Sequence, residues 1–371
     1  MSDAALKLDF PWDGEVLNRH DGEEAGGRLT FEVSGTAWPG ATVTCRGATT
    51  VADAEGKFSL PAEITQAGET LAVVAEGEGR KAEATSRVMW DADSRLRYRF
   101  SIDDNIEFLA DLGREPDKYP SLFDHWYLGF WRGLHEQYGT KFHFNIYRSD
   151  GKGFVTDQLS DRWRGEWADN ADWLHLSFHA RQDKPDRIYR FAGYDELAED
   201  LARVHEQILR FAGPEVMTPV TTVHWAETPL EGTKAVRDAG YRGLVMSAIE
   251  PVESCTTRYH FGDEHLHHIA RRDAWMDYET DVLFLQADIC VNSILLDDIA
   301  AKMEAEVADP HKRDLVELII HEQYFRRELV YYLPDVMDRV RATIGFVAER
   351  GYEPVFWGDE FFPGDRGPGG R

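Results

Sequence analysis

Apolar and polar positions alternate through much of the first quarter of the chain. The alternation runs from about residue 28 to residue 90, and Gly, Pro and acidic residues interrupt it at short intervals. A period of two indicates half-buried strands, and regular turn signals without a helical stretch favour an antiparallel sandwich. We therefore predict a β-sandwich domain over residues 1–94. The alternating stretches are 28–37, 41–47, 56–62, 70–77 and 84–90.

From residue 96 onward, apolar strands alternate with amphipathic helices. The stretch 194–213, for example, repeats Leu197, Leu201, Val204 and Ile208 at helical spacing and stops at a glycine. Seven or eight such units predict a (β/α)7–8 barrel over residues 95–360, followed by a flexible tail, 361–371. The expected strands are 96–103, 141–147, 172–180, 217–224, 243–248, 281–289, 315–321 and 353–357, and the expected helices include 121–139, 194–213, 231–240, 296–308 and 334–351.

Charge and cysteine content narrow the classes of partner and compartment. The formal net charge of −26 argues against nucleic acid, because a phosphate backbone would be repelled. The sequence contains neither a run of eighteen apolar residues nor a basic amphipathic stretch, so it gives no indication of a membrane segment. The first residues lack a secretory pattern, and Cys45, Cys255 and Cys290 are far apart and odd in number. We expect free thiols in a reducing cytoplasm. Nothing in the sequence excludes a homo-oligomer.

Five of the predicted barrel strands end in side chains that bind metals or transfer protons. Active groups of β/α barrels gather at the C-terminal ends of the strands, so these side chains are expected to meet there. In an adjacent Asp pair, one carboxylate can bind a cation while the other stays free as a base. The alternative for Asp104 is a helix N-cap before residues 105–112. The strand-end residues are Asp103, Asp104, His179, His224, Asp288, His321 and Glu322.

The segment 175–183 supplies the candidate imidazole ligand. Strand alternation places His175, Ser177 and His179 on one face, with apolar residues on the other. If the chain turns helical after the strand, Asp183 lies one turn beyond His179, within reach of the same ion. We expect His179 to bind a metal and His175 to be a buried core residue.

The order of five motifs resembles the polysaccharide deacetylase family, whose fold is shared with nodulation-factor deacetylases. The resemblance covers about residues 97–358, and the strands before it resemble the immunoglobulin-like modules often fused to carbohydrate enzymes. The motifs are SIDDN (101–105), LSFHARQD (176–183), TTVHWAE (221–227), LIIHEQYF (318–325) and ERGYEPVFW (349–357).

The resemblance implies a metal-dependent mechanism. Asp103 would be the general base, and His321 the acid that protonates the leaving group. Asp104 and His179 would bind a divalent ion, which we expect to be zinc. The family's second metal histidine is replaced here by Asp183, so the third ligand is Asp183 or another group such as His224. The family's Arg-Pro motif is replaced by a His-Trp pair, and the glycine after its Asp pair by an asparagine.

Aromatic and charged residues near these motifs predict a carbohydrate substrate. Flat rings suit the apolar faces of sugars, and Trp225, beside His224, is the first candidate, with Trp163 a lesser one. Arg181 would meet a carboxylate on the substrate, or form an exposed ion pair. Glu227 is a further candidate for binding the substrate.

Three functions follow, in order of preference. The first is a metal-dependent hydrolase that removes an acyl group from an N- or O-acylated sugar or oligosaccharide. The second is a glycoside hydrolase or lyase that uses paired carboxylates such as Asp103, Glu227 and Glu322. The third is a non-catalytic carbohydrate-binding protein. A His-rich run, 260–268, which we expect to be a loop, is a weaker candidate for a second metal site.

Overall fold

The computed structural model describes residues 6–249, 251–255 and 257–370. The chain divides into two compact units. The first contains the residues up to Ser94 together with Ala274–Tyr278, and the second contains Arg95–Asp273 and the residues from Glu279 onward. The structure is mixed α/β with large sheets. None of the helices in the described ranges is long and apolar enough to cross a membrane.

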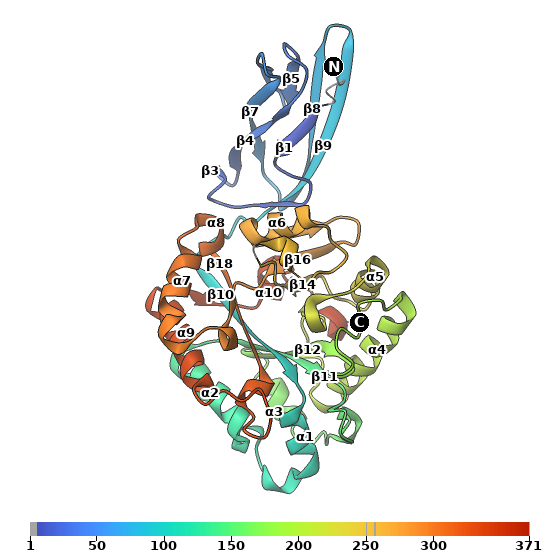
Figure 1. The fold of residues 1–371 in the computed structure, drawn as a ribbon, viewed down its shortest axis with the longest axis vertical. Helices are drawn as coiled ribbons and strands as arrows, with labels where there is room; N and C mark the ends of the chain where they lie inside the picture. The colour runs from blue at the N-terminus through green and yellow to red at the C-terminus, as the bar shows by residue number, and fades with distance from the viewer. Residues whose placement is uncertain (1–5, 250, 256, 371) are drawn as a thin grey trace. The chain divides into compact units, whose positions relative to one another are not determined.

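Every regular element described within residues 6–94 is a strand. In one sheet, β4 (Leu29–Thr36) pairs antiparallel with β7 (Lys57–Ile64), and in another β8 (Gly68–Gly77) and β9 (Arg80–Trp90) form a long hairpin (Figure 1). Alternate residues of both sheets enter one apolar core. The immunoglobulin-like character of these strands stays a prediction. The other strands of this unit are β1 (Lys7–Phe10), β2 (Glu15–Leu17), β3 (Gly22–Glu24), β5 (Thr42–Cys45), β6 (Ala48–Val51) and the distant β15 (Ala274–Asp277), which pairs with β2.

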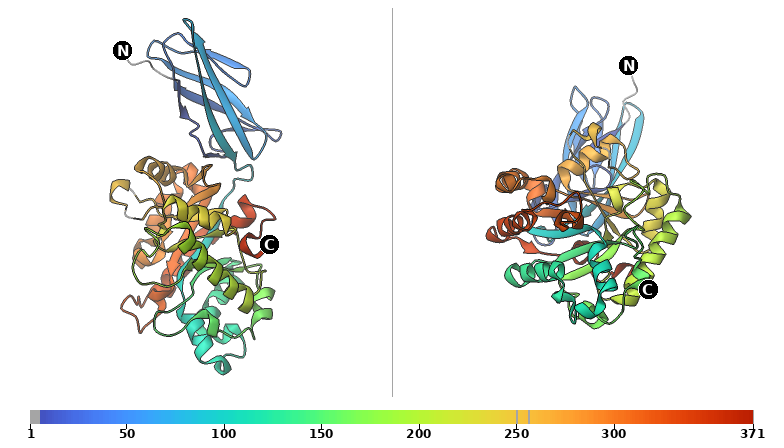
Figure 2. Two further views of the ribbon diagram at one scale, coloured as in Figure 1. Left: turned by 90° about the vertical axis from the view of Figure 1, so that its right-hand side faces the viewer. Right: turned by 60° about the horizontal axis from the view of Figure 1, so that its bottom comes forward.

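Parallel strands form the centre of the second unit. β10 (Arg97–Asn105) lies between β11 (Phe142–Tyr147) and β18 (Leu315–His321), and also pairs with β19 (Glu353–Pro354). β12 (Leu174–Ala180) pairs with β11. These strands are buried along almost their whole length, as in parallel sheets covered by helices on the outside (Figures 1 and 2).

A second parallel set follows in chain order. It contains β13 (Val220–Thr221), β14 (Gly243–Met246) and β16 (Val282–Gln286), after which β17 (Ile289–Cys290) pairs with β18. Among the described residues, the backbone ladders stop between β12 and β13 and again between β16 and β17. A closed barrel is therefore not confirmed. The first gap is bridged by side chains, since the hydroxyl oxygens of Ser177 and Thr221 are 2.8 Å apart.

The predicted helical spacing is observed in α4 (Tyr194–Phe211), which packs against β12. Its four apolar residues are buried, and Gly213 beyond it has φ +100°, which only glycine adopts readily. The other α-helices are α1 (Glu107–Arg114), α2 (Trp126–Tyr138), α3 (Arg164–Asp169), α5 (Leu230–Asp238), α6 (Asp263–Arg272), α7 (Ile299–Val307), α8 (Pro310–Arg313), α9 (Val336–Glu349) and α10 (Trp357–Phe361). The 3-10 helices are η1 (Pro116–Lys118), η2 (Leu122–Asp124), η3 (Thr156–Gln158), η4 (His224–Ala226), η5 (Val252–Ser254), η6 (Val291–Ser293), η7 (Leu296–Asp298), η8 (Glu322–Phe325) and η9 (Gly367–Gly370).

Two expectations about irregular segments need correction. Most of the His-rich run is not a loop but the helix α6, because Leu266, Ile269 and Ala270 are buried at helical spacing between the histidines. The expected flexible tail contains η9, and Gly367 is buried. A Cβ atom on that glycine would lie 2.5 Å from the carbonyl oxygen of Thr218. The tail is therefore anchored to the rest of the second unit at Gly367.

Two buried carboxyl groups share a site in this unit. Asp273, at the C-terminal end of α6, is 1% exposed, and Asp288, between β16 and β17, is partly buried beside it. The backbone N–H of Glu317 donates to Asp288 Oδ2 (2.8 Å), and Lys312 Nζ is 3.8 Å from Asp273 Oδ1. Burial raises the pKa of both carboxyls, and the charge of Asp273 raises that of Asp288 further. Asp288 therefore belongs to this pair and not to the strand-end site we expected.

The pair predicts a loss of stability as the pH rises. Because the folded-state pKa lies above the unfolded value of about 3.9, the bound proton stabilises the fold at low pH, and this contribution declines as the pH rises through the folded pKa. In Asp288→Asn, the amide oxygen can still accept the hydrogen bond from the Glu317 N–H, and the side chain has no proton to lose. We expect its unfolding free energy, measured in urea, to fall less between pH 5 and pH 8 than that of the wild type, by up to about 1.4 kcal/mol per pH unit.

The control is Asp169→Asn, an exposed substitution at the end of α3, which should keep the wild-type pH dependence. An identical pH slope for wild type and Asp288→Asn would contradict the raised pKa of Asp288.

Candidate active site and metal centre

In the second unit, polar side chains from several parallel strands meet where the strands have their C-terminal ends. Because the strands run in the same direction, residues at the ends of different strands become neighbours although they are far apart in sequence. The residues that the structure brings together are Asp103 and Asp104 of β10, Tyr147 of β11, His179 of β12, His224 at the start of η4, which follows β13, and His321 of β18.

Asp104, His179 and His224 form the group that could hold a metal ion. One donor atom from each lies within 4.8 Å of the others. Asp104 Oδ1 is 3.0 Å from His179 Nε2 and 3.3 Å from His224 Nδ1, and the two ring nitrogens are 3.2 Å apart. Ligands about 2.1 Å from a tetrahedral ion lie about 3.4 Å from one another. The spacing of the three donor atoms therefore fits a small divalent ion.

The hydrogen bonds around these residues orient them as ligands. His179 Nδ1 is 2.6 Å from the carbonyl oxygen of Thr222, so Nδ1 donates its hydrogen there and Nε2 faces Asp104. Gln323 Nε2 donates to Asp104 Oδ2 (2.7 Å), which leaves Oδ1 facing the two histidines. A backbone carbonyl and an amide thus hold both side chains from outside the group.

Opposite charges stabilise the carboxylate form of Asp104. Burial raises its pKa, but hydrogen bonds with His179 and His224 outweigh burial and hold the pKa well below its usual value. The Tyr147 hydroxyl also donates to Asp104 Oδ1 and is 2.9 Å from His224 Nδ1. Burial and the negative charge of Asp104 raise the pKa of Tyr147, which stays a neutral donor. An ionised carboxylate at this position is suited to bind a cation.

Backbone strain is concentrated at the same place. Asp104 has φ +62°, Trp225 φ +64° and Ala226 φ +46°, in the left-handed region that non-glycine residues rarely adopt. Each such residue costs of the order of 1–3 kcal/mol and persists only where the surrounding structure enforces it. Here the strained residues carry one ligand and the turn that follows His224.

Two further titratable groups flank the metal ligands. Asp103 is 2% exposed, and its Oδ1 accepts a hydrogen bond of 2.5 Å from Asn145. His321 Nδ1 is 2.9 Å from Asn292 Oδ1. Burial lowers the pKa of His321, but its hydrogen bond with Cys290 and the charge of Asp104 raise it to about 10. A carboxylate and an imidazole from two paired strand ends therefore lie beside the metal ligands.

Asp183 is not part of the metal group. Its side chain is 54% exposed, and Oδ1 is 3.7 Å from His224 Nε2, the nitrogen that does not face Asp104. Of the two alternatives for the third ligand, the structure thus places His224 with Asp104 and His179. His175 is a core residue, as expected: its ring stacks on Phe356 with 3.6 Å between centroids, and burial lowers its pKa to about 3.

Glu322 is structural, which corrects its expected catalytic role. Its carboxylate is fully buried and accepts hydrogen bonds from the backbone N–H groups of residues 106, 107 and 108, at 2.7, 2.9 and 2.8 Å. Arg326 Nη2 donates to it at 2.7 Å. The first amides of α1 are therefore capped by Glu322, which also excludes the alternative that Asp104 is their N-cap.

The candidates for substrate binding differ in accessibility. The expected role of Trp163 in substrate binding is wrong, because Trp163 is 1% exposed and its Nε1 donates to the carbonyl of Tyr119. Arg181 lies 3.7 Å from carboxylates of α4, which matches the exposed ion pair. Trp225 is 39% exposed beside His224. The guanidinium of Arg187 lies 4.8 Å from its ring centroid and also pairs with Glu227. Trp225 is thus the accessible aromatic next to the metal group.

Several residues that hydrogen-bond to the site residues were not predicted from the sequence. Asn145 and Tyr147 belong to a predicted strand, and Tyr147 ends it, which is the signal that identified the other site residues. Asn292 follows β17, which extends beyond the expected strand end at residue 289. No feature of the sequence pointed to Gln323, because its contact with Asp104 depends on the course of η8.

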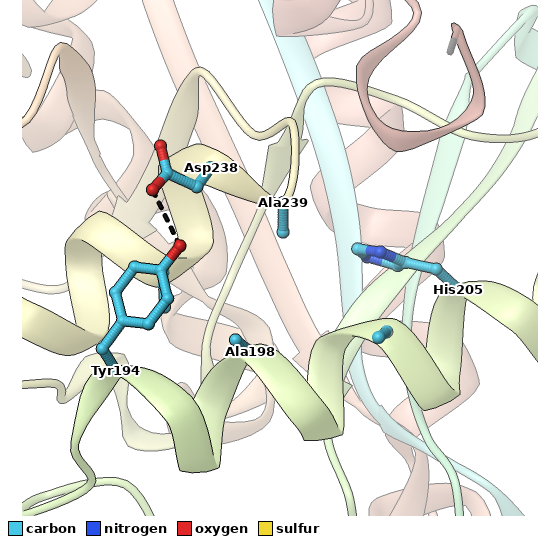
Figure 3. A pocket seen from close by; sticks show the side chains of 7 residues that line it. Tyr194, Ala198, His205, Asp238 and Ala239 are labelled. Atoms are coloured by element: carbon cyan, nitrogen blue, oxygen red, sulfur yellow. Dashed lines mark hydrogen bonds between the residues drawn. The ribbon is translucent and has the colours of Figure 1, made fainter.

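A separate groove of about 270 Å³ lies between α4 and α5 (Figure 3). It has alanine walls, and the hydroxyl of Tyr194 donates to Asp238 Oδ2 (2.8 Å) at one end. None of the residues predicted to act in catalysis or binding lines it. The lining residues are Tyr194, Ala198, Ala202, His205, Ala235, Asp238 and Ala239.

Comparison of the sequence with protein-family models and with curated proteins finds no match. Among solved structures, the chain is similar to a protein from Bacteroides fragilis assigned as an alpha-galactosidase, at 11% identity and a TM-score of 0.27, covering 93% of this chain and 78% of that one. It is also similar to a carbohydrate acetylesterase from Xanthomonas citri, at 12% identity and a TM-score of 0.18, covering 69% and 68%. Similarity at this level carries no functional argument.

The cap formed by Glu322 predicts a stability defect. In Glu322→Ala, three helix amides and the buried Arg326 lose their acceptor, so we expect a loss of about 3–5 kcal/mol in unfolding free energy, measured in urea. Glu328→Ala, an exposed position on the same segment, is the control and should change it by less than about 0.5 kcal/mol. A Glu322→Ala protein of normal stability but without activity would return Glu322 to the catalytic residues.

The metal group predicts unequal effects of two neighbouring substitutions. His224→Ala removes a donor atom, so we expect zinc affinity to fall about 100-fold or more in calorimetric titration of metal-free protein. Asp183→Ala should bind zinc like the wild type, because its carboxylate lies outside the group. Equal losses in both variants would show that Asp183 is a ligand and that the grouping is wrong.

Proposed function

We propose that this protein is a divalent-metal-dependent hydrolase that removes an acyl group from an N- or O-acylated sugar or oligosaccharide. The observation that carries the proposal is the grouping of Asp104, His179 and His224 beside a carboxylate, Asp103, and an imidazole, His321. A metal centre with two histidines and one carboxylate, flanked by a base and an acid, is suited to hydrolysis of an amide or ester.

The donor set favours zinc as the metal. Zinc in catalytic sites is held by three protein ligands, usually nitrogen with carboxylate oxygen, and keeps one position for water or substrate. When bound, such an ion lowers the pKa of water and polarises a carbonyl group. Asp104 would supply the oxygen ligand, and the two histidines the nitrogen ligands.

The protein's own groups would move the protons. Asp103 would take the proton of the attacking water, and protonated His321 would return one to the leaving amine or alcohol. The hydrogen bond with Cys290 supports this role, because it favours the charged form of His321. The same bond lowers the pKa of Cys290, although burial raises it.

The carbohydrate part of the proposal rests on Trp225. An exposed indole ring beside the metal group suits the apolar face of a sugar, and Arg187 over the ring suits a hydroxyl or carboxylate group. The glycosidase or lyase alternative is weakened, because Glu322 caps α1 and Glu227 pairs with Arg187.

Three free cysteines agree with the reducing cytoplasm that we expect, and the compartment stays a prediction.

The first test separates metal binding from proton transfer. In Asp103→Asn, the metal ligands are intact but the proton acceptor is gone. We expect wild-type zinc content by mass spectrometry and a fall in kcat of about 100- to 10,000-fold for acetate release from a panel of acetylated sugars. Asp172→Asn, an exposed carboxylate at the opposite end of β12, is the control and should keep wild-type kcat.

The products decide between the alternatives. New reducing ends without acetate would indicate a glycoside hydrolase, and unsaturated ends a lyase. Sugar binding without any product from the zinc-loaded protein would favour the carbohydrate-binding alternative.

A further inference from the structure

A continuous chain of buried hydrogen bonds leads from Asp103 into the interior of the second unit. Asn145 Nδ2 donates to Asp103 Oδ1 (2.5 Å), and the Ser177 hydroxyl donates to Asn145 Oδ1. His143 Nε2 is 2.7 Å from Ser177 Oγ, and Arg99 Nη2 contacts His143 Nδ1. All five side chains are at most 2% exposed. These bonds are therefore shielded from bulk solvent.

The chain has one consistent direction. An arginine side chain has only donors, so His143 Nδ1 must accept, and its Nε2 must then carry the hydrogen. His143 Nε2–H donates to Ser177, whose single hydrogen is left for Asn145 Oδ1. The amide group of Asn145 consequently presents its NH₂ to Asp103. Burial and the charge of Arg99 also lower the pKa of His143 well below its usual value, in agreement with a neutral ring.

The far end of the chain is fixed by a buried ion pair. Arg99 Nη1 lies 2.8 Å from Glu317 Oε1. Ser101 Oγ donates to Oε1 (2.7 Å), and Trp357 Nε1 donates to Oε2 (2.8 Å) of the same carboxylate. With both oxygens of Glu317 occupied, Arg99 has little freedom to release His143. The orientation of Asn145 is thus set by strands β10, β11, β12 and β18 together.

We propose that Asn145, oriented by Ser177, His143 and Arg99, is the positioning residue for the general base Asp103. The hydrogen bond from Asn145 to Asp103 Oδ1 fixes the plane of the Asp103 carboxylate. It keeps Oδ1 as an acceptor, so that Asp103 Oδ2 would abstract the proton. This inference rests on the proposed function, in which Asp103 is the base. It adds residues that would act only through Asp103 and touch neither metal nor substrate.

A purely structural network would behave differently. Loss of a buried hydrogen bond lowers stability wherever it occurs, but it has no reason to lower kcat at constant KM and constant metal content. The matched control is Thr343→Val. Thr343 is equally buried, and its hydroxyl donates to the carbonyl of Arg339 (2.9 Å) within α9, away from the hydrogen bonds that lead to Asp103.

The experiment measures kcat, KM, zinc content and melting temperature on full-length, zinc-loaded protein. In Asn145→Ala we expect kcat for acetate release to fall about 100-fold, with KM and zinc content unchanged, because a displaced base loses its alignment. Ser177→Ala should lose about tenfold, and Ser177→Thr, which restores the hydroxyl, should regain most of it. Losses in kcat no greater than in Thr343→Val would overturn the proposal.

A double variant makes the test specific for Asp103. In an Asp103→Asn background, Asn145→Ala should cause no further loss of kcat, because the group that it positions is already absent. Additive losses would show that Asn145 acts by another route and would overturn the proposal. If Asn145→Ala does not fold, the Ser177→Ala and Ser177→Thr pair in both backgrounds decides the same question.

A readout without turnover separates this inference from the proposed function. In protein with ¹⁵N-labelled histidine, the signal of His143, assigned by its loss in His143→Gln, should report a neutral ring with hydrogen on Nε2. A charged ring or hydrogen on Nδ1 would overturn the direction of the chain. A wild-type protein with that signal but no hydrolytic activity would contradict the proposed function and leave the base without a role, which overturns the positioning proposal as well.

Discussion

The inward face of the parallel strands carries polar side chains that have no access to water, and each must find its hydrogen-bond partner inside the protein. The period of two along β10 places Arg99, Ser101 and Asp103 on this face. A guanidinium at one end and a carboxylate at the other set the direction of every bond between them. The position of the candidate base therefore depends on the register of four strands and not on its immediate neighbours.

The candidate metal group lies where this interior ends. Past Asp103 the backbone of β10 turns into the left-handed region at Asp104, which carries its carboxylate toward His179 and His224. The helix that follows does not compete for this carboxylate, because Glu322 from another strand end accepts its first amide hydrogens. A structural carboxylate next to the site thus leaves a second one available to bind an ion.

Carboxyl groups of this unit show how strongly the surroundings decide their chemistry. Hydrogen bonds with two histidines hold the pKa of Asp104 well below its usual value despite burial. Burial also raises the pKa values of Asp273 and Asp288, but each faces the other, and their pKa values rise well above the usual value. The first environment stabilises the charged form and suits a cation, whereas the second retains a proton. Burial alone does not distinguish them.

Local pattern was enough to predict the first strands, the helical spacing of α4 and the strand ends that carry Asp104, His179 and His224, because alternation, periodicity and strand direction are properties of short segments. The same pattern could not separate Asp288 or Glu322 from the site, since both also follow apolar strands. Their roles come from partners such as Asp273 and the first amides of α1, which only the folded chain places beside them. The sequence by itself determined which residues stand at the strand ends. Tertiary structure alone decided which of them meet, because a hydrogen bond or a metal group depends on distances of a few ångströms between residues that lie far apart along the chain.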